Sequence, residues 1–163
     1  MTVAAALLVP PSAGPAPGLR EAVVAALASG ADEVLVVVSS AALAGAVPDG
    51  ATVLLDDAPG ADEASTARVA TDWSARAGHT ALVVWRGPFA RSGSVATRRG
   101  AWAALVGSVV KEPVVVGTYR RAPAGLVRLD AAVWSALPLS GSLEVLWRAR
   151  PELSAEVALD GAA

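Results

Sequence analysis

The residues best suited to bind a ligand lie at the end of an apolar run, Ala81–Trp85, and just after it. Trp85 closes the run, Arg86 comes directly after it, and Arg91 stands a few residues further on. Guanidinium groups bind phosphates and carboxylates through paired hydrogen bonds. An aromatic ring and a cation at the end of a buried strand therefore predict a place where an anionic ligand binds.

A second candidate is the segment Pro10–Gly18, which follows the first apolar run of the chain. It contains Ser12, Gly14 and Gly18, and Arg20 stands just beyond it. Glycine allows a phosphate to approach the backbone closely, and a basic side chain balances the phosphate charge. The four prolines of this segment lack backbone N–H donors. Both a rebuilt phosphate loop and an ordinary rigid connection therefore remain open.

Three further groups have a functional and an ordinary interpretation. The pairs Asp56-Asp57 and Asp62-Glu63 offer the oxygen ligands that divalent cations prefer, yet such pairs are also typical of solvated turns. Arg120-Arg121 either touches a ligand or is a charged hairpin tip. His79, the only histidine, is expected to have a capping or surface role, because no triad or metal pattern surrounds it in the sequence.

The elements that would position these residues alternate between apolar runs and helical patterns. The expected strands are Val3–Val9, Glu33–Ser39, Ala51–Leu55, Ala81–Trp85, Pro113–Thr118, Leu126–Leu129 and Ala155–Leu159. The expected helices are Leu19–Ser29, Ala41–Val47, Ala64–Ala77, Val95–Val109, a helix capped by Asp130, and Gly141–Ala149. This order predicts a single α/β domain over residues 1–163, with three Rossmann-like layers and a mostly parallel central sheet.

The amino-acid composition excludes several classes of function. The chain has 163 residues, 54% of them hydrophobic and 17% charged, and no cysteine, which excludes disulfides and thiolate chemistry. No signal peptide or membrane-spanning run is evident, so a cytoplasmic protein with no membrane partner is expected. Residues 86–128 carry seven arginines and one lysine against one acid. The five tryptophans are spread along the chain and do not alternate with these basic residues as a stacking platform would require, so nucleic acid is not an expected partner.

The order of elements resembles the molybdenum-cofactor nucleotidyltransferase-like family of NTP transferases. PVVVGTY, a turn and LVRLDAAVW are similar to that family's strand, turn and following strand, and RARPELSAEVALD is similar to its final helix and edge strand. The resemblance implies a nucleotidyltransferase-type fold. It also implies a Gly-rich loop for a nucleoside triphosphate and an Asp that holds Mg²⁺ after the fourth strand.

The sequence departs from that pattern where the family keeps its chemistry. Prolines fill the phosphate loop, and Arg86 stands where the resemblance implies the Asp. The first hypothesis is therefore a degenerate, non-catalytic member that binds a small ligand or a partner protein. The second is an active nucleotidyltransferase or anionic-metabolite enzyme whose site is rebuilt from Arg20, Arg86, Arg91 and Arg98. Mg²⁺ and a nucleoside triphosphate are expected only in the second case.

A third hypothesis is a self-associating module, in which tryptophan and alanine-rich helix faces form contacts between copies. Trp73, Trp102, Trp134 and Trp147 are expected in the core or in such a contact, and Trp85 is the tryptophan expected at a ligand site. An exposed apolar face on Ala64–Ala77 or Val95–Val109 would favour self-association.

Overall fold

The computed structural model describes residues 1–9, 18–86 and 95–160. Within these ranges a seven-stranded sheet has the order β3-β2-β1-β4-β6-β5-β7. Its strands are β1 (Val3–Leu8), β2 (Glu33–Val38), β3 (Thr52–Leu55), β4 (Ala81–Trp85), β5 (Val114–Tyr119), β6 (Ala122–Asp130) and β7 (Ser154–Ala158). The helices are α1 (Leu19–Leu27), α2 (Ala41–Ala44), α3 (Glu63–Ala77), α4 (Arg99–Val106) and α5 (Glu144–Ala149). Short 3₁₀ segments are η1 (Val95–Thr97), η2 (Ala131–Ala136) and η3 (Pro151–Leu153).

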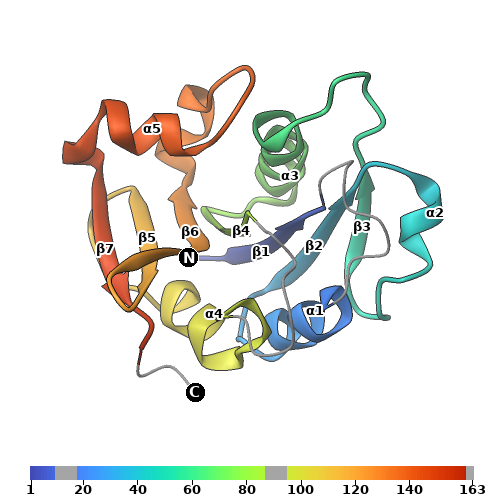
Figure 1. Ribbon diagram of the computed structural model, residues 1–163, viewed down its shortest axis with the longest axis horizontal. Coiled ribbons are helices and arrows are strands. Elements are labelled where there is room, and N and C mark those ends of the chain that lie inside the picture. The colour runs from blue at the N-terminus through green and yellow to red at the C-terminus, as the bar shows by residue number, and fades with distance from the viewer. Residues whose placement is uncertain (10–17, 87–94, 161–163) are drawn as a thin grey trace.

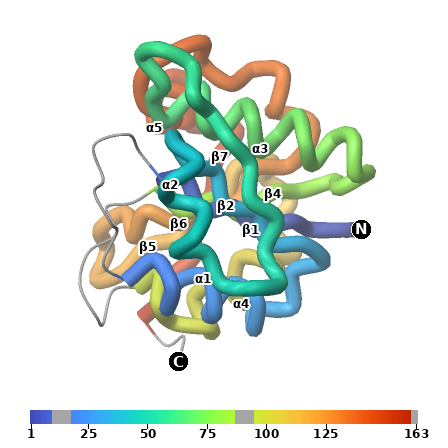
Figure 2. The backbone as a smooth tube through the Cα atoms, turned by 90° about the vertical axis from the view of Figure 1, so that its right-hand side faces the viewer, coloured from blue at the N-terminus to red at the C-terminus, as the bar shows by residue number. Residues whose placement is uncertain are grey.

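The three layers follow from the alternation of side chains along the strands. In β1, Ala5 and Leu7 pack with α1 and α4, whereas Ala6 and Leu8 pack with α3 and the segment leading into α5. Figure 1 shows α1 and α4 on one side of the sheet and α3 and α5 on the other, and Figure 2 shows the same layers from the side. The continuous apolar runs of β1 and β4 are buried along their whole length, as expected for strands covered on both faces.

The sheet is mixed, so the expected mostly parallel sheet is found only in part. Strands β1 to β4 pair in parallel, and β5 is parallel to β7. Strand β6 runs antiparallel to both of its neighbours. The carboxyl ends of β1 to β5 and the start of β6 consequently lie along one edge, which we call the carboxyl edge.

The hairpin between β5 and β6 is tighter than predicted. The sequence indicated a turn over 120–125 and a short strand after it, but β6 begins at Ala122 and pairs Pro123 with Thr118. Arg120 and Arg121 both have positive φ, 51° and 63°. Two such residues form the two-residue connection that matches the twist of paired strands. Pro123 and Gly125 signalled a turn but lie within the strand.

Two predicted helices also differ. The segment 95–109 is divided into η1 and α4 because Arg98 has an extended backbone, with φ −99° and ψ 117°. In α3 the buried face carries Ala67, Ala70 and Ser74, whereas Trp73, expected in the core or in a contact between copies, is 39% exposed. Trp73 therefore lies beside the inner face of α3 and not on it.

Arg128 is a buried arginine in the middle of β6, only 3% exposed. One of its terminal nitrogens, Nη1, donates to the carbonyls of Leu105 and Ser108 at 3.3 and 2.7 Å, just where α4 ends. Its Nε donates to a carboxylate oxygen of Asp130 at 3.0 Å. Asp130 makes no side-chain cap for the 3₁₀ segment that follows it. The predicted cap is therefore wrong: this carboxylate neutralises Arg128 instead.

Candidate functional site

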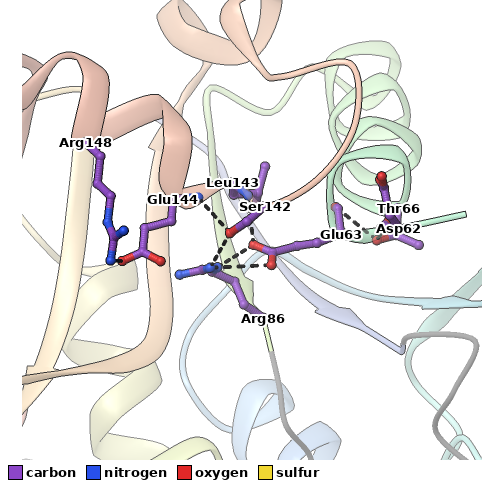
Figure 3. A network of polar contacts seen from close by, with 8 residues as sticks. All are labelled: Asp62, Glu63, Thr66, Arg86, Ser142, Leu143, Glu144 and Arg148. Atoms are coloured by element: carbon purple, nitrogen blue, oxygen red, sulfur yellow. Dashed lines mark hydrogen bonds and ion pairs between the residues drawn. The ribbon is translucent and has the colours of Figure 1, made fainter.

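The candidate site begins with Arg86, the first residue beyond β4 at the carboxyl edge. Its Nε donates to Oε1 of Glu63 at 2.5 Å, and one terminal nitrogen donates to Oγ of Ser142 at 3.0 Å. The guanidinium also lies 5.0 Å from the ring centroid of Trp147. The side chains of Arg86 and Glu63 are 15% and 23% exposed. Figure 3 shows this network, in which the cation is satisfied by groups of its own chain.

Glu63 is held in place by the way α3 begins. Asp62 caps the helix, because its carboxylate accepts from the backbone N–H of Ser65 and the Ser65 hydroxyl accepts from the N–H of Asp62. Glu63 is then the first helical residue, where the helix dipole favours a negative side chain. This position directs its carboxylate toward the end of β4, where Arg86 stands.

The connection into α5 closes the network from the other side. The backbone N–H of Leu143 donates to Oε1 of Glu63 at 3.1 Å, and that of Gly141 donates to a carboxylate oxygen of Asp62 at 2.6 Å. The N–H of Ala64 donates in turn to the carbonyl of Gly141 at 3.0 Å. The hydrogen bonds from Gly141 and Ser65 hold the pKa of the Asp62 carboxyl below its usual range.

Three of the four acidic residues in the two pairs have structural partners, and the fourth, Asp57, is exposed. Asp56 is buried and accepts a hydrogen bond from the Ser65 hydroxyl at 2.8 Å, Asp62 caps α3, and Glu63 pairs with Arg86. Within the described residues, no group of three or more potential metal ligands gathers in one place. At the end of β4 the described chain places the guanidinium of Arg86 where the resemblance implies a carboxylate for Mg²⁺.

The other predicted site residues lie apart from this network or outside the described ranges. Ser12, Gly14 and Arg91 lie outside the described residues. Gly18 is the left-handed N-cap of α1, with φ 86°, and Arg20 is exposed in the first turn. Trp85 is 3% exposed and packs in the core beneath α1 and α4.

Sequence reasoning missed three partners of Arg86: Glu63 in this role, Ser142 and Trp147. They reach Arg86 from positions 23, 56 and 61 residues away along the chain. Only for Glu63 does the sequence contain a local pattern from which its place near Arg86 could be predicted. The cap Asp62 and its partner Ser65 mark the start of a helix, and the first turns of crossover helices lie near the carboxyl ends of the strands.

A second polar cluster lies at the opposite edge of the sheet, around Glu33. Its carboxylate accepts hydrogen bonds from Thr52 and Trp73 at 2.9 and 3.1 Å and lies 2.9 Å from Nε2 of His79. His79 is thus half-buried and paired with Glu33. Burial opposes ionisation of Glu33, but the hydrogen bonds from His79, Thr52 and Trp73 outweigh it and lower the pKa of its carboxyl.

This cluster predicts a pH-dependent contribution to stability. The pKa of Glu33 is lower in the folded than in the unfolded chain, so its stabilising contribution is complete at pH values above the ordinary pKa of a glutamate and is progressively lost over the pH range below it. The stability difference between wild type and Glu33→Gln, measured by urea unfolding, is expected to shrink over this range. Glu21→Gln, at an exposed helix position, is the control for loss of one charge. If the free energies of unfolding of wild type and Glu33→Gln changed with pH by the same amount, the prediction would be contradicted.

The described residues contain no helix that is both long and apolar enough to cross a bilayer.

Three solved structures show a fold similar to that of this chain. Rv0371c from Mycobacterium tuberculosis, solved as a complex with manganese, gives a TM-score of 0.69 at 15% identity, with 99% of this chain and 89% of that chain covered. Glucosyl-3-phosphoglycerate synthase from the same organism, solved with uridine diphosphate, gives 0.62 at 14% identity, covering 99% and 71%. A protein described as a nucleotide-diphospho-sugar transferase from Desulfovibrio desulfuricans gives 0.58 at 12%, covering 97% and 80%.

No family model and no curated protein matches the sequence. The structural likenesses establish the fold alone: a mixed-sheet α/β fold of the nucleotide-diphospho-sugar transferase type, which is nucleotidyltransferase-like in the broad sense. The narrower resemblance to molybdenum-cofactor enzymes stays a prediction.

Proposed function

We propose that this chain is a nucleotidyltransferase-like domain that does not carry out metal-assisted transfer and works by binding an anionic small molecule or a partner protein. The observation that carries the proposal is the ion pair between Arg86 and Glu63 at the end of β4. A cation at this position opposes a divalent metal, and its own carboxylate partner satisfies it.

The contacts of Arg86 also limit its use toward a ligand. A phosphate that recruited this guanidinium would have to compete with Glu63, Ser142 and the ring of Trp147. Breaking a partly buried pair leaves the carboxylate of Glu63 without its main counter-charge, which is costly. We therefore interpret Arg86 as a structural replacement for a metal ligand and not as a free phosphate-binding group.

The neighbours make the contrast concrete. Rv0371c is known in complex with manganese, and glucosyl-3-phosphoglycerate synthase is known with uridine diphosphate. A fold of this type can therefore hold a metal or a nucleotide. In this chain Asp62 caps α3, Asp56 accepts a hydrogen bond from the Ser65 hydroxyl, and Glu63 pairs with Arg86.

The second candidate function is an enzyme acting on an anionic metabolite through arginines in place of a metal. Arg20, Arg98 and Arg99 favour it, since none of them pairs with a carboxylate among the described residues. Such an enzyme would bind a nucleotide or a phosphorylated metabolite without a divalent cation. Self-association and a protein partner stay predictions.

Thermal-shift titrations with ATP, GTP, CTP, UTP and UDP, each with and without Mg²⁺ or Mn²⁺, separate these possibilities. A ligand at 100 times its dissociation constant stabilises the folded chain by about 2.7 kcal/mol, which is readily measured. The proposal predicts no shift that depends on the metal. A shift without metal would fit the binding of an anionic molecule, and only turnover of that ligand would then favour the arginine-based enzyme. A metal-dependent shift with one nucleotide would overturn the proposal.

A further inference from the structure

A hollow of about 420 Å³ lies beside α1 on the face of the sheet that α1 and α4 cover. The outer side of α1 forms one wall, and the start of α4 with the preceding 3₁₀ turn forms the other. Its lining includes Arg20, Glu21, Val24, Ala25, Ala28 and Arg99. None of these residues belongs to the network around Arg86. The hollow is thus a separate feature of the molecule, within the usual size range of small-molecule sites.

The two arginines of the hollow lack the carboxylate partner that four other described arginines have. Arg86, Arg128, Arg148 and Arg150 each pair with a carboxylate, and Arg68 donates to two backbone carbonyls. Among the described residues, neither Arg20 nor Arg99 makes an ion pair. Glu21 lies in the same hollow but within 4 Å of neither guanidinium, so the hollow carries an excess positive charge.

The positions of both arginines add to this excess. Arg20 is the second residue of α1 and Arg99 is the first residue of α4. Cations at these positions face the positive ends of helix dipoles, which disfavour them. Arg98, the neighbour of Arg99, adds another cation 5.2 Å from the ring of Tyr119. A bound anion would offset several unfavourable interactions at once.

The rest of the hollow is apolar. Val24 is 52% exposed, although it lies on a helix whose other valine is fully buried, and Ala25 and Ala28 continue the same wall. An apolar wall beside two unpaired guanidiniums matches a ligand with a charged end and an apolar body. Guanidinium groups favour phosphate, because their planar N–H groups pair with two of its oxygens.

We propose that this hollow binds a phosphate monoester, with Arg20 and Arg99 holding the phosphate and Val24, Ala25 and Ala28 contacting the organic part. The inference deepens the proposed function by giving it a ligand class and a site. The two can fail separately. Metal-dependent nucleotide binding would overturn the proposed function, whereas the hollow is tested with metal-free probes.

The test uses inorganic phosphate and phenyl phosphate, followed by changes in the amide NMR signals of the full chain. Phenyl phosphate is expected to bind at least about tenfold more tightly than inorganic phosphate, because its ring buries apolar surface. The double variant Arg20→Gln/Arg99→Gln is expected to weaken both probes by at least about tenfold. Val24→Asn should weaken phenyl phosphate alone, and Glu21→Gln should tighten both probes by removing a negative charge.

Arg76→Gln is the matched control, because Arg76 is an exposed arginine in the last turn of α3, on the other side of the sheet. It is expected to change neither affinity. All of the substituted residues are exposed, so the variants should fold. Equal losses in Arg76→Gln and the double variant would overturn the proposal by showing attraction to net charge alone. Absence of binding, or signal changes confined to residues away from the hollow, would also overturn it.

Discussion

Replacing Arg128 with methionine is expected to lower the free energy of unfolding by about 2–3 kcal/mol, because buried carbonyls at the end of α4 lose a charged hydrogen-bond donor. The substitution leaves the carboxylate of Asp130 without its counter-charge and removes the donor to the carbonyls of Leu105 and Ser108. Methionine fills much of the same volume, so the loss reports the missing hydrogen bonds and charge. Urea unfolding monitored by tryptophan fluorescence measures it.

Arg76→Met is the control for the same chemical change at an exposed site, where a loss within about 0.5 kcal/mol is expected. Asp130→Asn keeps the carbonyl contacts of Arg128 and should cost less than Arg128→Met. A loss below about 1 kcal/mol for Arg128→Met would show that the end of α4 is satisfied by other means.

The second large effect concerns the coupling between Arg86 and Glu63. A double-mutant cycle built from Arg86→Ala, Glu63→Ala and the double variant is expected to give a coupling free energy of about 1–3 kcal/mol. The pair is only 15% and 23% exposed, so solvent screens it less than a surface pair. The cycle cancels the separate effects of shortening each side chain and of changing the first turn of α3.

Arg148 and Glu144 supply the matched comparison, because they form an ion pair at 2.8 Å with side chains 74% and 31% exposed. A cycle on this helical pair is expected to give only about 0.3–0.5 kcal/mol. If the coupling of Arg86 with Glu63 were no larger than that of the exposed pair, Arg86 would be available to a ligand at little cost. The interpretation of Arg86 as a structural group would then fail.

The parts of the fold that the sequence predicted well are those set by local pattern. The runs of β1, β2 and β4 are apolar throughout, and strands buried on both faces require that composition. The end of α3 at Gly78, with φ 82°, is also a local signal. The reversed direction of β6 is not a local property, because it depends on which strands β6 pairs with.

The predictions that were wrong concern features that depend on contacts between distant parts of the chain. Pro123 and Gly125 signal a turn, yet pairing with β5 and β4 draws this segment into the sheet. Arg128 stands within an apolar run, and nothing in the run shows that the end of α4 will meet it. At the candidate site, the position of Arg86 could be predicted from the end of an apolar run. Its neutralisation by Glu63 depends on a contact across the fold.

The measurement that tests the central claim most directly is the electron paramagnetic resonance signal of free Mn²⁺. The signal is recorded for Mn²⁺ with the protein, with UDP, and with both together. We predict that adding the protein leaves the free Mn²⁺ signal unchanged, with or without UDP, because Arg86 and Glu63 satisfy each other at the end of β4. A protein-dependent loss of the free signal that disappears in Asp56→Asn would place a metal at the carboxyl edge and contradict the account.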